Sequence, residues 1–247
     1  MSFRRERSTF RRRDEDVTVT RVTLWHGFSF VLALGVCKAA APLIAAVQDA
    51  DPALAAARLR AGTGDAVAQF SVGSILYYGT KQTAEAVEWI KKAAVQGHAA
   101  AEFQMGQMHD FGFGVPQDDR QALEWYQRAA GHGSAAGQRS VGDFYQKGRA
   151  IPADAAAAVR WYQHAAEADD LRAQYQLGQA FFSGTGVARN YVTAYLWFTI
   201  AAGQTPLKDN RMQLVELANI AAARMTPEQL AEAQRRVAAW RSPAARR

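Results

Sequence analysis

The chain has 247 residues, of which 49% are hydrophobic and 21% are charged, a composition that excludes an intrinsically disordered protein. Its formal net charge of +6 is concentrated at the ends, because residues 1–21 carry +3 and residues 224–247 carry +4, which leaves −1 for the rest. A folded body without excess positive charge argues against nucleic-acid binding, so no nucleic-acid partner is expected.

Residues 1–50 have the order of an export signal. An Arg-rich start precedes the apolar run "FSFVLALGV" at 28–36, and small residues follow it, with Ala39 and Ala41 as a candidate cleavage site. An uncleaved membrane anchor over residues 24–47 is the alternative. In both cases the positive charges lie on the N-terminal side, which predicts an exported protein, periplasmic or anchored in the inner membrane. A cytoplasmic protein remains the other alternative.

Residues 51–63 predict a short N-terminal cap helix. The segment "PALAAARLRA" starts directly after Asp51, so an acidic cap is followed by proline at the first helical position.

Four copies of one unit fill residues 64–205. A tryptophan recurs every 36 residues, an alanine pair follows it four residues later, and a glycine precedes it in the first half of the unit. The recurring residues are Trp89, Trp125, Trp161 and Trp197, Ala93, Ala129, Ala165 and Ala201 with the alanine after each, and Gly73, Gly106, Gly142 and Gly178. Such a period is the signature of a repeat architecture. Large residues such as Trp125 and Tyr126 are expected to fill the space between units, and small ones allow close helix approach.

Each unit predicts helix, loop and helix. In the second unit, residues 99–112 place Ala101 and Met105 on one helical face, and "FGFGVPQDD" forms the turn. Asp118 is the expected N-cap of the next helix, and Asp154 and Asn190 stand at the equivalent places. Stacked pairs bury a shared core that one pair lacks. The predicted fold is all-α: a right-handed α-solenoid of about four helix-loop-helix repeats with helical caps at both ends.

Residues 206–241 predict C-terminal capping helices. In "RMTPEQLAEAQRRVAAW", Thr226 and Gln229 form a capping box with Pro227 at the first helical position. A basic tail, residues 242–247, ends the chain.

The repeat resembles that of the Sel-one-like family, a branch of the tetratricopeptide-like α-solenoids. "AEFQMGQMHDFGFGVPQD" followed by "WYQRAAGHG" in the second unit, and "AQYQLGQAFFSGTGVARN" in the fourth, are similar to the family's pattern of both helices. The resemblance implies an adaptor or scaffold that holds another protein or a peptide.

The residue types that carry catalysis or bind metals are sparse. Cys37 is the only cysteine, and the five histidines show no spacing that would place two metal ligands on one helical turn, so neither a metal nor a cofactor is expected. No nucleophile motif is present, which predicts a protein that is not an enzyme. The alternative, implied by disulfide-rich secreted relatives, is an envelope enzyme or binder acting on β-lactams or cell-wall fragments. His109 is expected to pack in the core, and His98 and His132 to lie at solvated helix ends.

The first helix of each unit is expected to line the concave side and to bind a protein or peptide partner. Three positions relative to its glycine should face away from the core, and they are unusually aromatic. The predicted contact residues are Phe70, Ser74, Tyr77, Phe103, Gln107, Asp110, Arg139, Asp143, Gln146, Tyr175, Gln179 and Phe182. Packing of the aromatic rings on neighbouring helices is the alternative.

Overall fold

The computed structural model describes residues 7–12, 15–20, 52–80 and 83–240, and the chain divides into two units at Asp51 and Pro52. In the first unit, β1 (Arg7–Arg12) and β2 (Glu15–Thr20) pair antiparallel. The sequence analysis did not predict this hairpin, although alternating Val and Thr in β2 are a strand signal. The predicted signal or anchor at 24–47 lies outside the described residues. Within the ranges described, no helix has the length and apolarity needed to cross a membrane.

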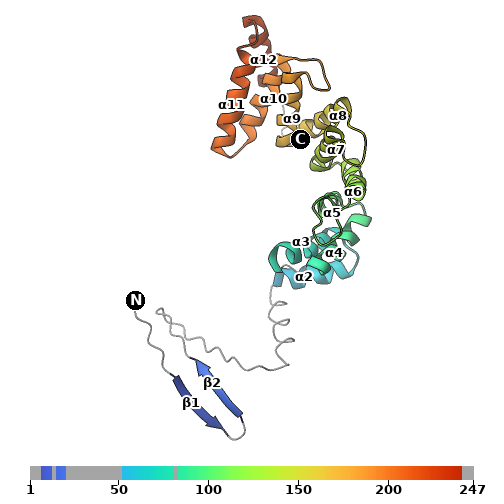
Figure 1. Cartoon of the computed structure of the whole chain (residues 1–247), viewed down its shortest axis with the longest axis vertical. Helices are drawn as coiled ribbons and strands as arrows, with labels where there is room; N and C mark the ends of the chain where they lie inside the picture. Colours follow the sequence, from blue (N-terminus) through green and yellow to red (C-terminus); the bar gives the residue numbers. More distant parts are fainter. Residues whose placement is uncertain (1–6, 13–14, 21–51, 81–82, 241–247) are drawn as a thin grey trace. The chain divides into compact units, whose positions relative to one another are not determined.

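The second unit contains eleven α-helices in its described part. They are α2 (Pro52–Gly62), α3 (Ala66–Ile75), α4 (Thr83–Val95), α5 (Ala99–Phe111), α6 (Asp119–Gly131), α7 (Ala135–Lys147), α8 (Ala155–Glu167), α9 (Leu171–Ser183), α10 (Tyr191–Gln204), α11 (Lys208–Ala222) and α12 (Pro227–Ala239), and a short π-helix, η1 (Leu76–Thr80), follows α3. Figure 1 shows them following one another along a curved row. The prediction of an α-solenoid of four helix pairs is confirmed for this unit.

The second helix of each later repeat begins at a predicted cap. The carboxylate of Asp118 accepts a hydrogen bond from the N–H of Arg120 at 2.8 Å, and Asp154 and Asn190 cap α8 and α10 in the same way. Each cap satisfies a backbone donor that the helix leaves unpaired. The capping box of Thr226 and Gln229 at the start of α12 is also present. These local predictions are confirmed.

The turns that end the first three repeats keep one backbone conformation even where the residue type changes, whereas the equivalent Thr205 of the fourth repeat is extended. Gly97 and Gly133 end the first two repeats with φ of 82° and 84°, and Asp169 takes the equivalent place with φ of 65°. The stacking of repeats therefore imposes a left-handed conformation that a non-glycine residue adopts only at a cost.

In repeats two to four the repeat glycine of the first helix makes room for a ring of the second helix, and in the first repeat Gly73 makes room for Ile90. A Cβ atom added to Gly106 would lie 2.5 Å from the Tyr126 ring, and one added to Gly142 would lie 2.7 Å from the Tyr162 ring. Both tyrosines are almost fully buried, at 2% and 1% exposure. The residue after each repeated tryptophan is thus buried in the core, and it is aromatic in repeats two to four, which explains why the glycine recurs with it.

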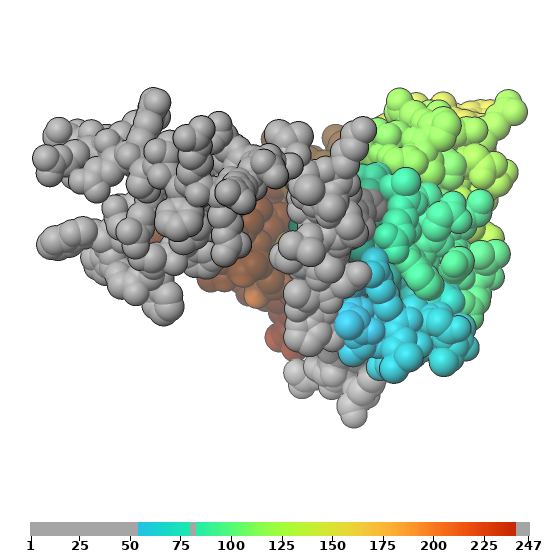
Figure 2. Space-filling view, turned by 90° about the horizontal axis from the view of Figure 1, so that it is seen from below, coloured from blue at the N-terminus to red at the C-terminus, as the bar shows by residue number. Residues whose placement is uncertain are grey.

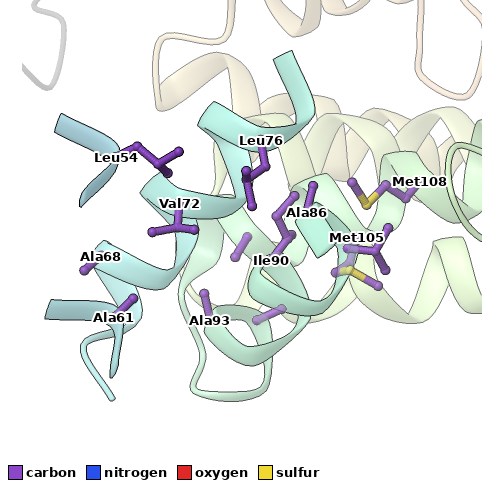
Figure 3. Close-up of a cluster of buried hydrophobic side chains, with 13 residues drawn as sticks. Leu54, Ala61, Ala68, Val72, Leu76, Ala86, Ile90, Ala93, Met105 and Met108 are labelled. Carbon is purple, nitrogen blue, oxygen red and sulfur yellow. The ribbon is translucent and has the colours of Figure 1, made fainter. Parts of the chain in front are cut away.

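The cores continue from one repeat into the next. Figure 3 shows Leu54 of α2 and Val72 of α3 in the same cluster as Ile90, Met105 and Met108 of the next helices. The cap helix α2 therefore shares its core with the first two repeats, and in Figure 2 its cyan surface runs into the teal surface of the repeats. Trp125 of the second repeat packs against this cluster, as the predicted role between units requires.

The two C-terminal helices cover different sides of the fourth repeat. α11 packs along α10 as a further helix of the row, whereas α12 turns back onto α10. The ring of Trp240, just after α12, meets the ring of Trp197 edge-on, with centroids 5.1 Å apart. The last repeated tryptophan is thereby buried by the chain's own end.

Candidate partner-binding groove

An open groove of about 420 Å³ lies where α7, α8, α9, α10 and α11 meet. Gln146 of α7 and Gln179 and Phe182 of α9, three of the predicted contact residues, line it. The rings of Tyr162 and Phe198 form part of its wall. The structure therefore brings together predicted residues from the third and fourth repeats at one hollow surface.

The aromatic residues three positions before the repeat glycine are half-buried. The ring centroid of Phe103 lies 5.6 Å from that of Tyr126, and Tyr175 lies 6.3 Å from Phe198. Phe70 instead stacks on His98 of the next repeat at 4.8 Å. These rings pack on neighbouring helices with one side and keep part of their surface open.

The expectation that Asp110 faces solvent is wrong. Its side chain is only 12% exposed, because it accepts a hydrogen bond from the Tyr126 hydroxyl at 3.1 Å and pairs with Arg149 at 2.7 Å. Arg149 also binds Asp119 and lies over the Phe144 ring, 4.5 Å from its centroid. Asp110 is thus part of a buried network that joins the loop of the third repeat to α5 and α6.

An equivalent network orients Tyr162 beside the groove. Its hydroxyl donates to Asp143 and lies 2.8 Å from Oε1 of Gln146, while Arg139 pairs with Asp143 at 3.0 Å. Burial raises the pKa of the Tyr162 phenol, and the Asp143 carboxylate raises it further. The hydroxyl therefore stays protonated, and the predicted residues Arg139 and Asp143 serve each other as partners.

Burial and charge also shift pKa values in the network around Asp110 and Tyr126. Desolvation raises the pKa of Tyr126, and the charge of Asp110 adds to this effect. The hydrogen bond from Arg149 holds the pKa of Asp119 below its ordinary value of 3.8, and the same bond raises the pKa of Arg149. The shifts of Asp119 and Arg149 mark an interaction that stabilises the folded state, whereas the raised pKa of Tyr126 keeps its phenol protonated.

The remaining predicted contact residues do not line the groove. Ser74, Tyr77 and Gln107 are half-buried in the first two repeats. Tyr77 packs against the first core cluster, and burial raises the pKa of its phenol. The groove wall therefore includes three of the twelve predicted contact residues, and the other nine lie outside it.

Glu102, whose side chain is completely buried, was not predicted as a functional or structural residue. Arg128 donates to it at 3.0 Å, and Nδ1 of His132 lies 2.6 Å from its other oxygen. Arg128 also donates to the carbonyl of Ala94, whereas in the first repeat Gln69 donates to the equivalent carbonyl with its own amide. The change from glutamine to glutamate in a single repeat was the available signal.

The two junction histidines lie at helix ends, and the side chain of His132 is 52% exposed while His98 is half-buried. His132 is held by Glu102, and His98 caps α5 by accepting a hydrogen bond from the N–H of Ala101 at 3.2 Å. The positions at helix ends are therefore as predicted, and the contacts that each histidine makes there were not foreseen because they come from the neighbouring repeat or from the helix that the residue caps. No group of three or more His, Cys, Asp or Glu side chains could hold a metal ion among the residues described.

A second hollow, of about 470 Å³, is formed by α8, α9, α10 and α12. Its walls include Trp197 and Trp240, together with the charged side chains of Glu167 and Arg236. The wall of the second hollow thus contains charged side chains, whereas the wall of the first groove contains none.

This arrangement of stacked helix pairs with open grooves defines an α-solenoid repeat protein. The Sel1 repeat matches residues 66–98, 99–134, 135–170 and 171–205, which together exceed half of the chain. The chain belongs to the Sel1 repeat family. Proteins of this family are generally protein-interaction scaffolds and are typically not catalytic.

Solved structures of similar proteins include a Sel1 repeat protein from Oxalobacter formigenes. It is 31% identical with a TM-score of 0.60, and the match covers 69% of this chain and 80% of that one. A protective antigen of uropathogenic Escherichia coli with an SLR fold is 27% identical with a TM-score of 0.46, covering 74% of this chain and 47% of that one. Cysteine-rich protein B of Helicobacter pylori is 25% identical with a TM-score of 0.40, covering 50% and 93% respectively. No curated protein matches the chain.

Proposed function

We propose that this protein is a non-catalytic scaffold that binds a segment of a partner protein on the face formed by the first helices of its repeats. The groove between repeats three and four carries the proposal, because its volume of about 420 Å³ lies within the range of ligand-binding clefts. Gln146, Gln179 and Phe182 are the proposed principal contacts.

Half-buried residues outside the groove extend the proposed contact surface. Phe103 and Tyr175 each offer one side of a half-buried ring, and Gln107 lies one turn after Phe103 on α5. Rigid aromatic side chains suit partner recognition because little conformational entropy is lost when they bind. Asp110 contributes indirectly, through the network that holds Tyr126.

The acidic and basic side chains near the groove are paired with other groups of the protein, which supports a scaffold. Asp143 is engaged by Arg139 and by the Tyr162 hydroxyl, so it is held as a structural carboxylate. The phenol of Tyr162 has a raised pKa and remains neutral. A general acid–base pair would need a group that titrates near neutral pH and reaches a substrate.

Site-specific photo-crosslinking in cells tests the proposal. A photoreactive amino acid in place of the exposed Gln179 should give a discrete adduct with a protein, and the same residue in place of Gln127, exposed on α6, should not. Adding Gln179→Arg or Gln127→Arg to a tagged chain should reduce co-purification of that protein only in the first case. Equal adducts at both positions, or none at Gln179, would contradict the proposal.

We further propose that the scaffold works in the bacterial cell envelope. The basic, apolar and small-residue order of the first 50 residues supports export or anchoring through residues 24–47. A reporter active only outside the cytoplasm, fused after residue 50, should be active, and N-terminal sequencing of the mature protein separates cleavage from anchoring. An inactive fusion beside an active control fusion would show a cytoplasmic protein instead.

A further inference from the structure

We infer that the groove between repeats three and four recognises an uncharged, extended peptide segment, and that it does so through the peptide main chain. The inference rests on the proposed function, and names the chemistry of the partner segment that this groove accepts.

The groove carries no charge on its walls. Thirteen side chains of the described residues line it, and none of them is acidic or basic. Asp143, which accepts from Tyr162 of the wall, pairs with Arg139, and Arg224 lies over the rings of Phe182 and Tyr191 and donates to the Tyr191 hydroxyl. A charged peptide side chain that entered the groove would lose hydration without gaining an ion pair from the wall, which is unfavourable.

The second hollow provides an internal comparison. Glu167 and Arg236 stand in its wall, so a charged or zwitterionic segment would find partners there. The uncharged wall of the first groove is thus a local property and not a consequence of the composition of the whole chain.

Amide side chains with open hydrogen-bonding capacity face the groove. Gln176 is half-buried and forms no side-chain hydrogen bond within the described part of the chain. The Tyr162 hydroxyl, which donates to Asp143, lies 2.8 Å from the amide of Gln146, so this contact occupies only one end of that amide. The NH₂ group of Gln179 donates to Tyr175, which leaves its Oε1 as an acceptor. The groove therefore offers donors and acceptors together.

These groups match the needs of a peptide backbone. Every residue of an extended segment other than proline brings one N–H donor and one C=O acceptor, and burying them without partners is costly. Glutamine amides can serve both kinds of group, whereas a carboxylate or an ammonium serves only one. A main chain is thus better suited to this groove than a charged ligand.

An apolar floor complements the amides. Val159, Ala180 and Phe198 line the groove, and Leu217 of α11 closes one side of it. Successive side chains of an extended segment point to opposite sides, so alternate side chains can enter this floor while the backbone meets the glutamines. The expected segment is a few consecutive neutral residues with an aliphatic side chain at alternate positions.

Selection from a displayed library of random peptides of about twelve residues, using the full-length protein, tests the inference. The expected winners carry a run of neutral residues with aliphatic side chains and compete with the adduct formed at Gln179. N-methylation of single main-chain amides within that run should weaken binding about tenfold at the positions that donate hydrogen bonds.

Matched variants separate groove recognition from other binding. Gln176→Leu should weaken the selected peptides about tenfold, whereas Gln127→Leu on α6 should leave binding unchanged. The N-methylated peptides are tested on the unmodified protein. They therefore show whether the main chain is recognised even if Gln176→Leu unfolds the chain.

Three outcomes overturn the inference: charged peptides that win and compete at Gln179, N-methylation without effect, or no selected peptide that competes there. A cellular adduct at Gln179 would still stand in each case, and would leave the scaffold proposal intact. Absence of that adduct would remove the scaffold proposal itself.

Discussion

Replacing Gly106 by alanine should destabilise the protein, against the usual effect of this change within a helix. Gly106 lies in α5 beneath the ring of Tyr126, and an added Cβ would lie 2.5 Å from ring atoms Cδ1 and Cε1. The ring has little room to move, because its hydroxyl donates to Asp110 at 3.1 Å and it packs edge-on against Phe144. The variant therefore tests whether the Tyr126 ring packs directly against Gly106.

Two opposing effects set the magnitude. Glycine to alanine inside a helix ordinarily stabilises by about 0.5–1 kcal/mol. Overpacking a well-filled core costs about 1–3 kcal/mol. The net loss in the free energy of unfolding should be about 1–2 kcal/mol, which corresponds to a fall in Tm of about 3–6 °C for a unit of this size.

Thermal unfolding followed by circular dichroism measures the effect. Gly131→Ala is the matched control, since a Cβ there would have no atom within 4 Å, and this variant should keep or slightly raise Tm. Gly106→Ala with a Tm equal to or above that of the unmodified protein would refute the close approach of helix and ring.

Two further predictions concern the network around Arg149. Arg149→Met should lower the free energy of unfolding by about 1–3 kcal/mol in urea titrations, less than for a fully buried pair, since the Arg149 side chain is 29% exposed. Asp119→Asn should flatten the acid dependence of Tm. Arg149 lowers the pKa of the Asp119 carboxylate, so its stabilisation is present above pH 3.8 and is lost as the pH falls through the lowered value.

Exposed residues of the same type provide the controls for these two predictions. Arg120→Met removes a charge close to Asp119 in the sequence and should change stability little, because Arg120 is exposed. Asp209→Asn on α11 should leave the acid dependence unchanged. Equal losses for Arg149→Met and Arg120→Met, or an unchanged acid profile for Asp119→Asn, would show that the network contributes nothing.

The first helices of the repeats show how far sequence reasoning reached into the candidate site. Gln146, Gln179 and Phe182 were predicted as contacts and meet at one groove. Tyr162 and Phe198 also line it, although they stand at the repeat position of Tyr126, for which only packing was predicted. A periodic pattern identifies which positions are equivalent, yet it does not show which repeats stand close enough to a capping helix to enclose a hollow.

Buried polar residues were the hardest to predict. Asp110 and Glu102 stand at repeat positions that carry uncharged residues in the other units, and a charge at such a position suggests solvent. Both are buried, because Arg149 and Arg128 reach them from the following loop and helix. A carboxylate enters a core when a cation and hydrogen-bond donors accompany it.

The sequence by itself determined the 36-residue period, the pairing of helices, the N-caps at Asp118, Asp154 and Asn190 and the family of the protein. These depend on helical periodicity and on hydrogen bonds between residues two or three positions apart, so nearby residues suffice to specify them. Only the tertiary structure decided that the Tyr126 ring rests on Gly106, that Asp110 is buried and that a neutral groove opens beside α11. Those features depend on side chains from several helices meeting in space, where small differences in side-chain volume and in the available partners decide between burial and exposure.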